Sequence, residues 1–369
     1  MSIVPAIMVV CLSVAAGILP TAVYVLAVWW IDRYEKEPVK LLAAALLWGA
    51  IPAGILSLVI EGLSQGPVAA ATREYSQLVG TSLVAPIVEE CVKGLALLGL
   101  FWLARSDFDD VLDGIVYGSI VGFGFAMSEN ILYYLRSWAQ GGVAPWTIVV
   151  LGRSIPFGLN HAIFTSLTGV GFGLARYERS FGRRALFVAL GLIAAVTAHF
   201  AHNFWLAAGG FCVLSFLADW LGVLVVLSIV VLAWRREAAW MATELPEEVS
   251  SGVLTPLQFE TISSRRERLR QGWRVLGISG LHQARLWRRL VDTSTELAFK
   301  KHQRALLGKE KGNDAAIVRL RAAVLAIRQD LGDEAAARSR ICSTCGELSA
   351  RDMVATCPHC GSAWPESEG

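Results

Sequence analysis

The sequence predicts an all-α polytopic membrane protein with about seven transmembrane helices, followed by a cytoplasmic helical segment and a small zinc ribbon with four cysteines. The chain is 54% hydrophobic and only 17% charged, a balance that soluble domains rarely reach because their surfaces need polar residues. Apolar runs continue to about residue 234, and the chain then becomes basic and polar. We therefore expect a transmembrane domain over 1–234, a basic helical segment over 235–340 and the ribbon over 341–364.

Seven apolar stretches are each long enough to cross a bilayer. About 20 apolar residues span the hydrocarbon core as a helix, because a helix satisfies its own backbone groups in lipid. The first stretch lacks a basic n-region and is too long for a signal peptide, so we expect a retained helix. The predicted helices are Ile3–Trp30, Leu41–Leu63, Leu78–Ala104, Val111–Leu135, Ile148–Ala175, Ala185–Ala207 and Phe211–Trp234.

Basic residues accumulate in alternate loops. Cytoplasmic loops carry an excess of Lys and Arg, so the pattern predicts a multi-pass protein of the cell membrane with its N-terminus outside and its tail cytoplasmic. The loops after the first, third and fifth predicted helices and the start of the tail carry Arg33, Lys36, Lys40, Arg105, Arg176, Arg179, Arg183, Arg184, Arg235 and Arg236.

The third predicted helix contains ionisable residues whose cost in a membrane has to be explained. A charge at the bilayer centre costs roughly 2.5–3.5 kcal/mol on insertion scales. Glu89 and Lys93 are one helical turn apart, and Glu90 is beside them. An ion pair with Lys93 explains one carboxylate and leaves the second unexplained. Pro86, one turn earlier, should loosen the local backbone hydrogen bonding.

The next three predicted helices each add polar side chains. The fourth contains Glu129, the fifth His161, and the sixth His199 and Asn203, which share one helix face. Close helix approach is favoured by small residues in the fourth helix. We expect one cavity lined by all these groups, since they can then solvate one another. The small residues are Gly118, Gly122 and Gly124.

These residue types suit amide hydrolysis without a Ser or Cys nucleophile. Two adjacent carboxylates of low exposure do not both ionise easily, and the ionised one, supported by Lys93, could take a proton from water. An imidazole and an amide could donate hydrogen bonds to the oxyanion that forms on a peptide carbonyl. The chain has no Gly-x-Ser-x-Gly, Gly-x-Gly-Asp or His-Glu-x-x-His motif.

In this order, Glu89-Glu90-x-x-Lys93, Phe125-x-x-x-Glu129, His161 and His199-x-x-x-Asn203 resemble the motifs of the PrsW intramembrane proteases. Those are relatives of the CAAX prenyl endopeptidases and of bacterial immunity-type proteases. The segment 32–38 resembles the first loop of PrsW proteins, and the likeness extends over about residues 20–210. It implies that Glu89 activates water with help from Glu90, that His199 and Asn203 form the oxyanion site, and that the substrates are membrane-anchored proteins or peptides, including membrane-anchored regulators.

Glu129 stands where CAAX enzymes have a His, so its role cannot be carried over unchanged. His161 could orient the water instead, or the Glu and His groups could bind a catalytic metal. Two other functions use the same residues. A proton- or cation-coupled transporter would relay ions through them, although the sequence has no inverted repeat. A catalytically idle receptor would need them only for structure.

The tail should contain helices and a metal site. Thr255-Pro256 predicts a helix start, and helical periodicity over 297–307 and 315–331 predicts a hairpin with an apolar seam. We expect this basic segment to be a solvated or membrane-surface spacer next to the lipid bilayer rather than a nucleic-acid site.

The final segment is a double Cys-x-x-Cys motif. Cys342, Cys345, Cys357 and Cys360 have the spacing of a structural zinc site, and Gly346 and Gly361 permit the tight turns that follow each pair. His359 should lie outside the ligand set because four thiolates suffice. Zinc here would fold the module.

Overall fold

The structure is a computed structural model of the chain, and it describes residues 3–32, 36–105, 107–308, 313–350 and 356–364. These residues are mostly helical, which confirms the predicted fold class. They form two compact units, Met1–Ala233 and Trp234–Gly369. Three residues of the predicted first loop, Arg33, Tyr34 and Glu35, lie outside the described residues.

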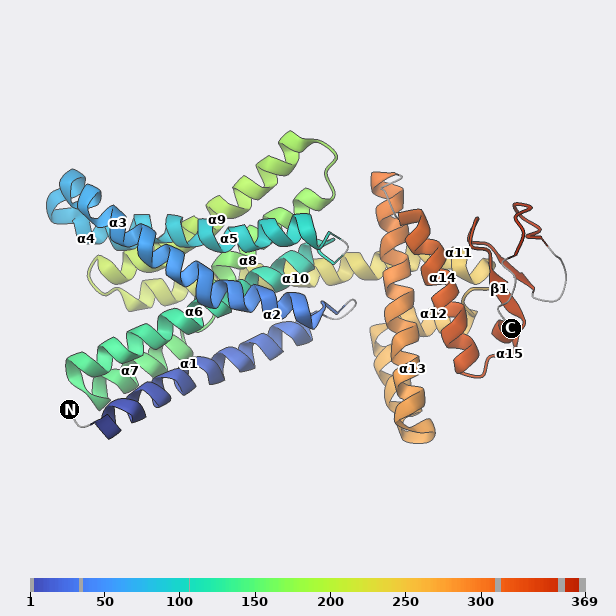
Figure 1. The fold of residues 1–369 in the computed structure, drawn as a ribbon, viewed down its shortest axis with the longest axis horizontal. Helices are drawn as coiled ribbons and strands as arrows, with labels where there is room; N and C mark the ends of the chain where they lie inside the picture. The colour runs from blue at the N-terminus through green and yellow to red at the C-terminus, as the bar shows by residue number, and fades with distance from the viewer. Residues whose placement is uncertain (1–2, 33–35, 106, 309–312, 351–355, 365–369) are drawn as a thin grey trace. The chain divides into compact units, whose positions relative to one another are not determined.

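Long helices joined by short connections make up the first unit (Figure 1). Two of its helices contain π-helical turns, η1 and η3, and one short turn is 3-10 helical, η2. The elements are α1 (Ile3–Ile31), α2 (Val39–Trp48), η1 (Gly49–Ala53), α3 (Gly54–Thr72), η2 (Arg73–Tyr75), α4 (Ser76–Val79), η3 (Gly80–Val84), α5 (Ala85–Leu103), α6 (Val111–Gly141), α7 (Val143–Ser154), α8 (Asn160–Arg176), α9 (Phe181–Ala207) and α10 (Cys212–Glu244), which continues into the second unit.

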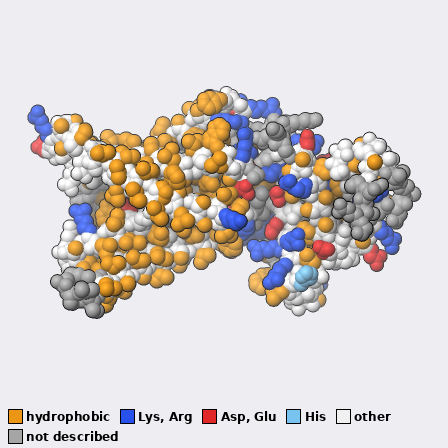
Figure 2. All heavy atoms as spheres, in the orientation of Figure 1, with side chains coloured by type: hydrophobic (Ala, Val, Ile, Leu, Met, Phe, Trp, Pro, Cys, Tyr) orange, Lys and Arg blue, Asp and Glu red, His pale blue; other side chains and the backbone are white. Residues whose placement is uncertain are grey.

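The apolar helices embed the first unit in a membrane as a multi-pass protein. Five helical stretches of the described chain are long and apolar enough to cross a bilayer: Ile7–Ile31, Val39–Leu103, Val111–Gly141, Phe181–Ala207 and Cys212–Ser250. The 65-residue stretch Val39–Leu103 folds back on itself, since α3 packs against α4 and α5. Figure 2 shows hydrophobic side chains over the visible face of this unit.

The predicted fifth helix, Ile148–Ala175, is wrong as a single helix. The structure divides it into α7, which begins earlier at Val143, and α8, with a break between Ser154 and Asn160. Pro156 lies in this break, and proline removes a backbone donor and clashes with the preceding turn. The break places His161 in the first turn of α8.

Helix α6 lies at the centre of the unit, packed against α1, α2, α5, α7 and α8. The three glycines predicted to allow close approach do so. A Cβ atom at Gly118 would lie 2.7 Å from the carbonyl oxygen of Thr165, and one at Gly122 would lie 2.3 Å from that of His161. Gly124 leaves similar room for the backbone of α2. Only glycine therefore permits the spacing at which α6 meets α2 and α8.

The loops predicted to be cytoplasmic meet at one end of the first unit. The Tyr117 hydroxyl, near the start of α6, donates to the Glu37 carboxylate in the loop after α1. Arg176, at the end of α8, donates to the carbonyls of Phe108 and Arg105 in the loop after α5, at 3.2 and 3.0 Å. The basic loops therefore share one side of the bundle.

The second unit is a helical domain that ends in the cysteine motif. Thr255 caps α12 by accepting a hydrogen bond from the backbone of Gln258, so the predicted helix start is confirmed. Leu297 packs with Ile317 and Leu320 in the predicted apolar seam. The elements are α11 (Pro246–Ser250), α12 (Pro256–Ser263), α13 (Arg265–Leu307), α14 (Asn313–Asp330), α15 (Glu334–Ala337) and the antiparallel strands β1 (Ser339–Ile341) and β2 (Leu348–Ala350).

Candidate active site

Two carboxylates and two imidazoles converge inside the helix bundle. Glu89 and Glu90 come from α5, His161 from α8 and His199 from α9. One donor atom from each residue lies within 4.8 Å of a donor atom of each of the others, and all four side chains are largely buried. We call these residues the Glu–His cluster. Three helices that are separate in the sequence thus bring the predicted groups to one place.

Local helix geometry explains how α5 contributes three of the site's charges. Glu89, Glu90 and Lys93 are spaced so that both carboxylates reach the same ammonium group, and Lys93 is fully buried. The π-helical turn η3 lies directly before Pro86, in the first turn of α5. The backbone is therefore irregular just before Pro86, as the proline predicted.

Glu90 is held by donors on both oxygens. Its Oε1 accepts from Lys93 Nζ at 2.5 Å and from His199 Nδ1 at 3.0 Å. Its Oε2 accepts from Thr165 Oγ1 at 3.0 Å. A buried carboxylate with three such partners is fixed in orientation, and its ammonium partner Lys93 is equally buried. Thr165 could not be recognised from the sequence, because a hydroxyl in an apolar helix carries no distinguishing signal.

Glu89 makes only longer contacts. Its Oε2 lies 3.5 Å from Lys93 Nζ, 3.8 Å from His161 Nδ1 and 3.9 Å from His199 Nε2. The last two distances exceed that of a direct hydrogen bond. Glu89 can therefore still accept hydrogen bonds, whereas Glu90 already accepts three.

His161 is oriented from its far side by Glu129. The Nε2 atom of His161 lies 3.0 Å from Glu129 Oε2, and the same carboxylate accepts from the Arg153 guanidinium at the end of α7. Arg153 also donates to Asn130 Oδ1 at 2.5 Å. Glu129 is therefore not a member of the Glu–His cluster. It contacts the cluster through His161. Arg153 was overlooked, although a charged residue inside a predicted membrane helix is itself a signal.

The structure does not bring Asn203 into the Glu–His cluster. Its side-chain amide donates to the backbone carbonyl of Thr81 in η3 at 2.9 Å. The neighbouring His202 joins a second polar group instead, with Nδ1 2.8 Å from Asp219 Oδ2 and 3.1 Å from Asn160 Nδ2. Asp219 is a further buried acid that sequence reasoning missed.

The Glu–His cluster fits a divalent cation by donor type. Two imidazoles and a carboxylate form a common set for catalytic zinc. His161 has one nitrogen bound to Glu129, and its other nitrogen faces Glu89. His199 repeats this pattern, with Glu90 as the outer carboxylate. Zinc-bound histidines typically have such outer carboxylates.

The ammonium group of Lys93 lies beside the Glu–His cluster. Lys93 Nζ lies 3.2 Å from His161 Nδ1 and within 3.5 Å of both carboxylates. This ammonium supplies charge that a cation would otherwise supply. The donor set is thus compatible with two kinds of site, one based on Lys93 and one based on a metal.

The four tail cysteines form a second candidate metal centre. The sulfurs of Cys342 and Cys360 lie 3.7 Å apart, as do those of Cys345 and Cys357. Four thiolates around a tetrahedral zinc, each about 2.3 Å from the ion, lie about 3.8 Å from one another. Both pairs have the same backbone turn, in which a glycine N–H donates to the carbonyl of the first cysteine. The cluster could therefore hold a metal ion.

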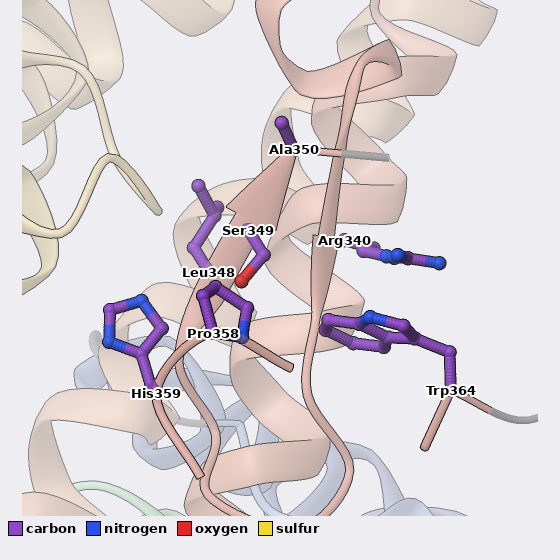
Figure 3. Close-up of a pocket in the computed structure, with 7 residues that line it drawn as sticks. All are labelled: Arg340, Leu348, Ser349, Ala350, Pro358, His359 and Trp364. Carbon is purple, nitrogen blue, oxygen red and sulfur yellow. The ribbon is translucent and has the colours of Figure 1, made fainter. Parts of the chain in front are cut away.

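Both glycines that follow the cysteine pairs have the predicted left-handed conformation, with φ of 74° at Gly346 and Gly361. His359 is not a member of the four-sulfur cluster. It lines a hollow of about 310 Å³ together with Arg340 and Trp364, and the Arg340 guanidinium lies over the Trp364 ring (Figure 3).

Comparison with known proteins places the helix bundle in a family. The profile described as "PrsW family intramembrane metalloprotease" matches residues 37–234. Protease PrsW of Geobacillus kaustophilus (strain HTA426) is 30% identical over 169 residues, which are 44% of this chain and 67% of the relative. Protease PrsW of Clostridioides difficile (strain 630) is 27% identical over 183 residues, 48% of this chain and 74% of the relative.

A third relative, protease PrsW of Bacillus subtilis (strain 168), is 26% identical over 198 residues, 53% of this chain and 83% of the relative. No solved structure matches the chain. The family profile covers more than half of the chain and includes every residue of the Glu–His cluster. The chain therefore belongs to the PrsW family of intramembrane proteases.

Proposed function

We propose that this chain hydrolyses peptide bonds of membrane-anchored proteins or peptides with a water molecule activated by Glu89. The observation that supports this role is the contrast between the two carboxylates. The Glu90 carboxylate accepts hydrogen bonds from Lys93, His199 and Thr165, whereas the Glu89 carboxylate has only contacts of 3.5 Å or more. A general base needs an accepting oxygen that structural donors have not already occupied.

In this mechanism Glu89 takes a proton from water while the water oxygen attacks the peptide carbonyl carbon. The proton then passes to the leaving amine, so that Glu89 serves first as base and then as acid. Lys93, whose ammonium lies 3.5 Å from Glu89, would stabilise the negative charge on the carbonyl oxygen. His199 would join it by donating from Nε2, which requires a proton on both ring nitrogens because Nδ1 donates to Glu90. Asn203 would have to leave the Thr81 carbonyl to join them.

A metal-dependent form of the same hydrolysis is the second candidate. It is supported by the outer carboxylates Glu129 and Glu90, each of which orients one imidazole whose other nitrogen faces Glu89. Glu89, His161 and His199 would hold the ion. A bound ion would polarise the substrate carbonyl and the attacking water.

The proposed substrates are single-span proteins, including membrane-anchored regulators. The basic loops gather at one end of the bundle, and positive loops favour the cytoplasm, so we propose that the tail is cytoplasmic and the N-terminus outside. Zinc is the proposed ion of the four-cysteine cluster.

Cleavage of a single-span substrate by the purified full chain in detergent tests the proposal. Glu89→Gln should abolish cleavage, and Glu178→Gln, in the loop after α8, should not. Cleavage that persists in Glu89→Gln would overturn the role of Glu89. Chelation on a Cys342→Ser background, which removes the tail site, separates the two forms: activity retained after complete metal removal favours the Lys93-based site, and activity restored by added zinc favours the metal.

A further inference from the structure

The long helix α13 has a hairpin shape that the proposed proteolytic activity does not explain. It is a hairpin of two helical arms, 265–279 and 281–307, joined at Gly280, where φ is 80°. A Cβ atom at Gly272 would lie 3.9 Å from Cδ1 of Trp287 on the other arm. In a straight helix, residues 15 positions apart are about 22 Å apart, so the arms must fold back on one another.

Large apolar side chains project from the closed end of this hairpin. Trp273, Ile278 and Leu281 are 72%, 76% and 65% exposed. Leu269 on the first arm is also exposed. In the described part of Trp234–Gly369, these four are most of the six large hydrophobic residues classed as exposed. Single exposed apolar residues are ordinary, but such a concentration marks a binding surface.

Arginines surround the apolar end. The segment 265–291 contains eight arginines and one acidic residue, Glu267. The exposed arginines lie on both arms, and only Arg268 is buried. An apolar tip with a basic border is the composition of helices that lie in the headgroup region of anionic membranes. The exposed arginines are Arg265, Arg266, Arg270, Arg274, Arg285, Arg288 and Arg289.

We propose that the α13 hairpin is a lipid-binding element, with Trp273, Ile278 and Leu281 inserted among the headgroups of an anionic membrane and the arginines on lipid phosphates. The proposal does not depend on the proteolytic site. Arginines alone would suit any phosphate, including those of nucleic acids. Burial of the aliphatic side chains, however, gains free energy only in an apolar environment, and a lipid surface offers one. The hairpin also follows a membrane-spanning helix, α10, after a connection of about 20 residues, so a membrane is always within its reach.

Fluorescence quenching in reconstituted full-length protein tests this inference. A fluorescent amino acid is placed at Ser279, at the tip, or at Leu257, which is also exposed and lies on α12. Each protein is reconstituted in nanodiscs whose phosphatidylcholine or phosphatidylglycerol chains are brominated. We expect strong quenching at Ser279 in discs that contain phosphatidylglycerol, weaker quenching in pure phosphatidylcholine, and little at Leu257 in either.

Variants separate lipid binding from the alternatives. Replacing Arg270, Arg274 and Arg285 by Gln should weaken partition of the tip by roughly two orders of magnitude, since each arginine near an anionic surface contributes about a fivefold change. Ile278→Glu should also abolish quenching, whereas Leu257→Glu, with the fluorophore at Ser279, should not. All these positions are exposed, so the thermal unfolding of the variants should match wild type. Equal quenching at both positions would overturn the proposal, as would a tip that responds to added RNA and not to lipid composition.

Discussion

The Nε2 atom of His161 lies 3.0 Å from Oε2 of Glu129, which joins the start of α8 to the middle of α6. Because Arg153 binds the same carboxylate, three segments fix the position of one imidazole. This is why the other nitrogen of His161 faces Glu89. The contact makes Glu129 a residue that orients His161 and not a member of the Glu–His cluster.

Removing the Glu129 charge should therefore lower activity without preventing assembly. In the metal-dependent form, where His161 would hold the ion, we expect Glu129→Gln to reduce kcat by about 10- to 100-fold, the usual effect of losing the outer partner of a metal-bound histidine. KM should change little, because Glu129 does not belong to the Glu–His cluster. Steady-state cleavage kinetics measure the effect, with Glu178→Gln as a control. Wild-type kcat in Glu129→Gln would contradict the positioning role.

The two adjacent glutamates should differ in their contribution to stability. Glu90→Gln leaves the buried Lys93 ammonium poorly compensated, so the free energy of unfolding should fall by about 3 kcal/mol. Glu89→Gln breaks no short contact and should change it by less than about 1 kcal/mol. Unfolding in mixed micelles, followed by circular dichroism, measures both. Equal destabilisation would show that Glu89 is as much a structural residue as Glu90.

Close packing of α6 on α8 should be essential for the site. In Gly122→Ala, the new Cβ would meet the His161 carbonyl at 2.3 Å, so the helices must separate. Overpacking of this kind costs about 1–3 kcal/mol, and it would also displace His161. Gly99→Ala on α5 is the matched control, because its Cβ would have no neighbour within 4 Å. A cleavage assay and thermal unfolding should show losses in Gly122→Ala alone.

The tail cysteines should bind one zinc ion independently of the membrane site. Cys345→Ser should reduce the zinc content of purified protein by one ion per chain, because it removes one of four thiolates. Chelation should unfold the segment that contains β1 and β2, since such small modules depend on their metal. Elemental analysis and proteolysis of the tail report the two effects, with Cys212→Ser in α10 as the control. Unchanged zinc content in Cys345→Ser would contradict a four-cysteine site.

Several features were predictable because they depend on local composition. Apolar length determines which segments can cross a membrane, and fixed Cys-x-x-Cys spacing brings sulfurs together through a tight turn. The glycines of α6 and the irregular backbone before Pro86 followed from residue size and proline chemistry. The break between α7 and α8 was missed although Pro156 lies within it, because continuous hydropathy hid a local backbone signal.

By itself, the sequence determined that this protein crosses the membrane several times, that acids and imidazoles lie within its helices, and that its tail has four paired cysteines. Only the tertiary structure decided that the hydrogen-bond acceptors of Glu90 are occupied whereas those of Glu89 are not. It also decided that Arg153 orients Glu129, that Asn203 binds Thr81, and that α13 doubles back at Gly280. The physical reason is that hydropathy and spacing act along one segment. Hydrogen-bond partners are assigned between segments, by distances of a few ångströms that the packing of α5, α6, α8 and α9 determines.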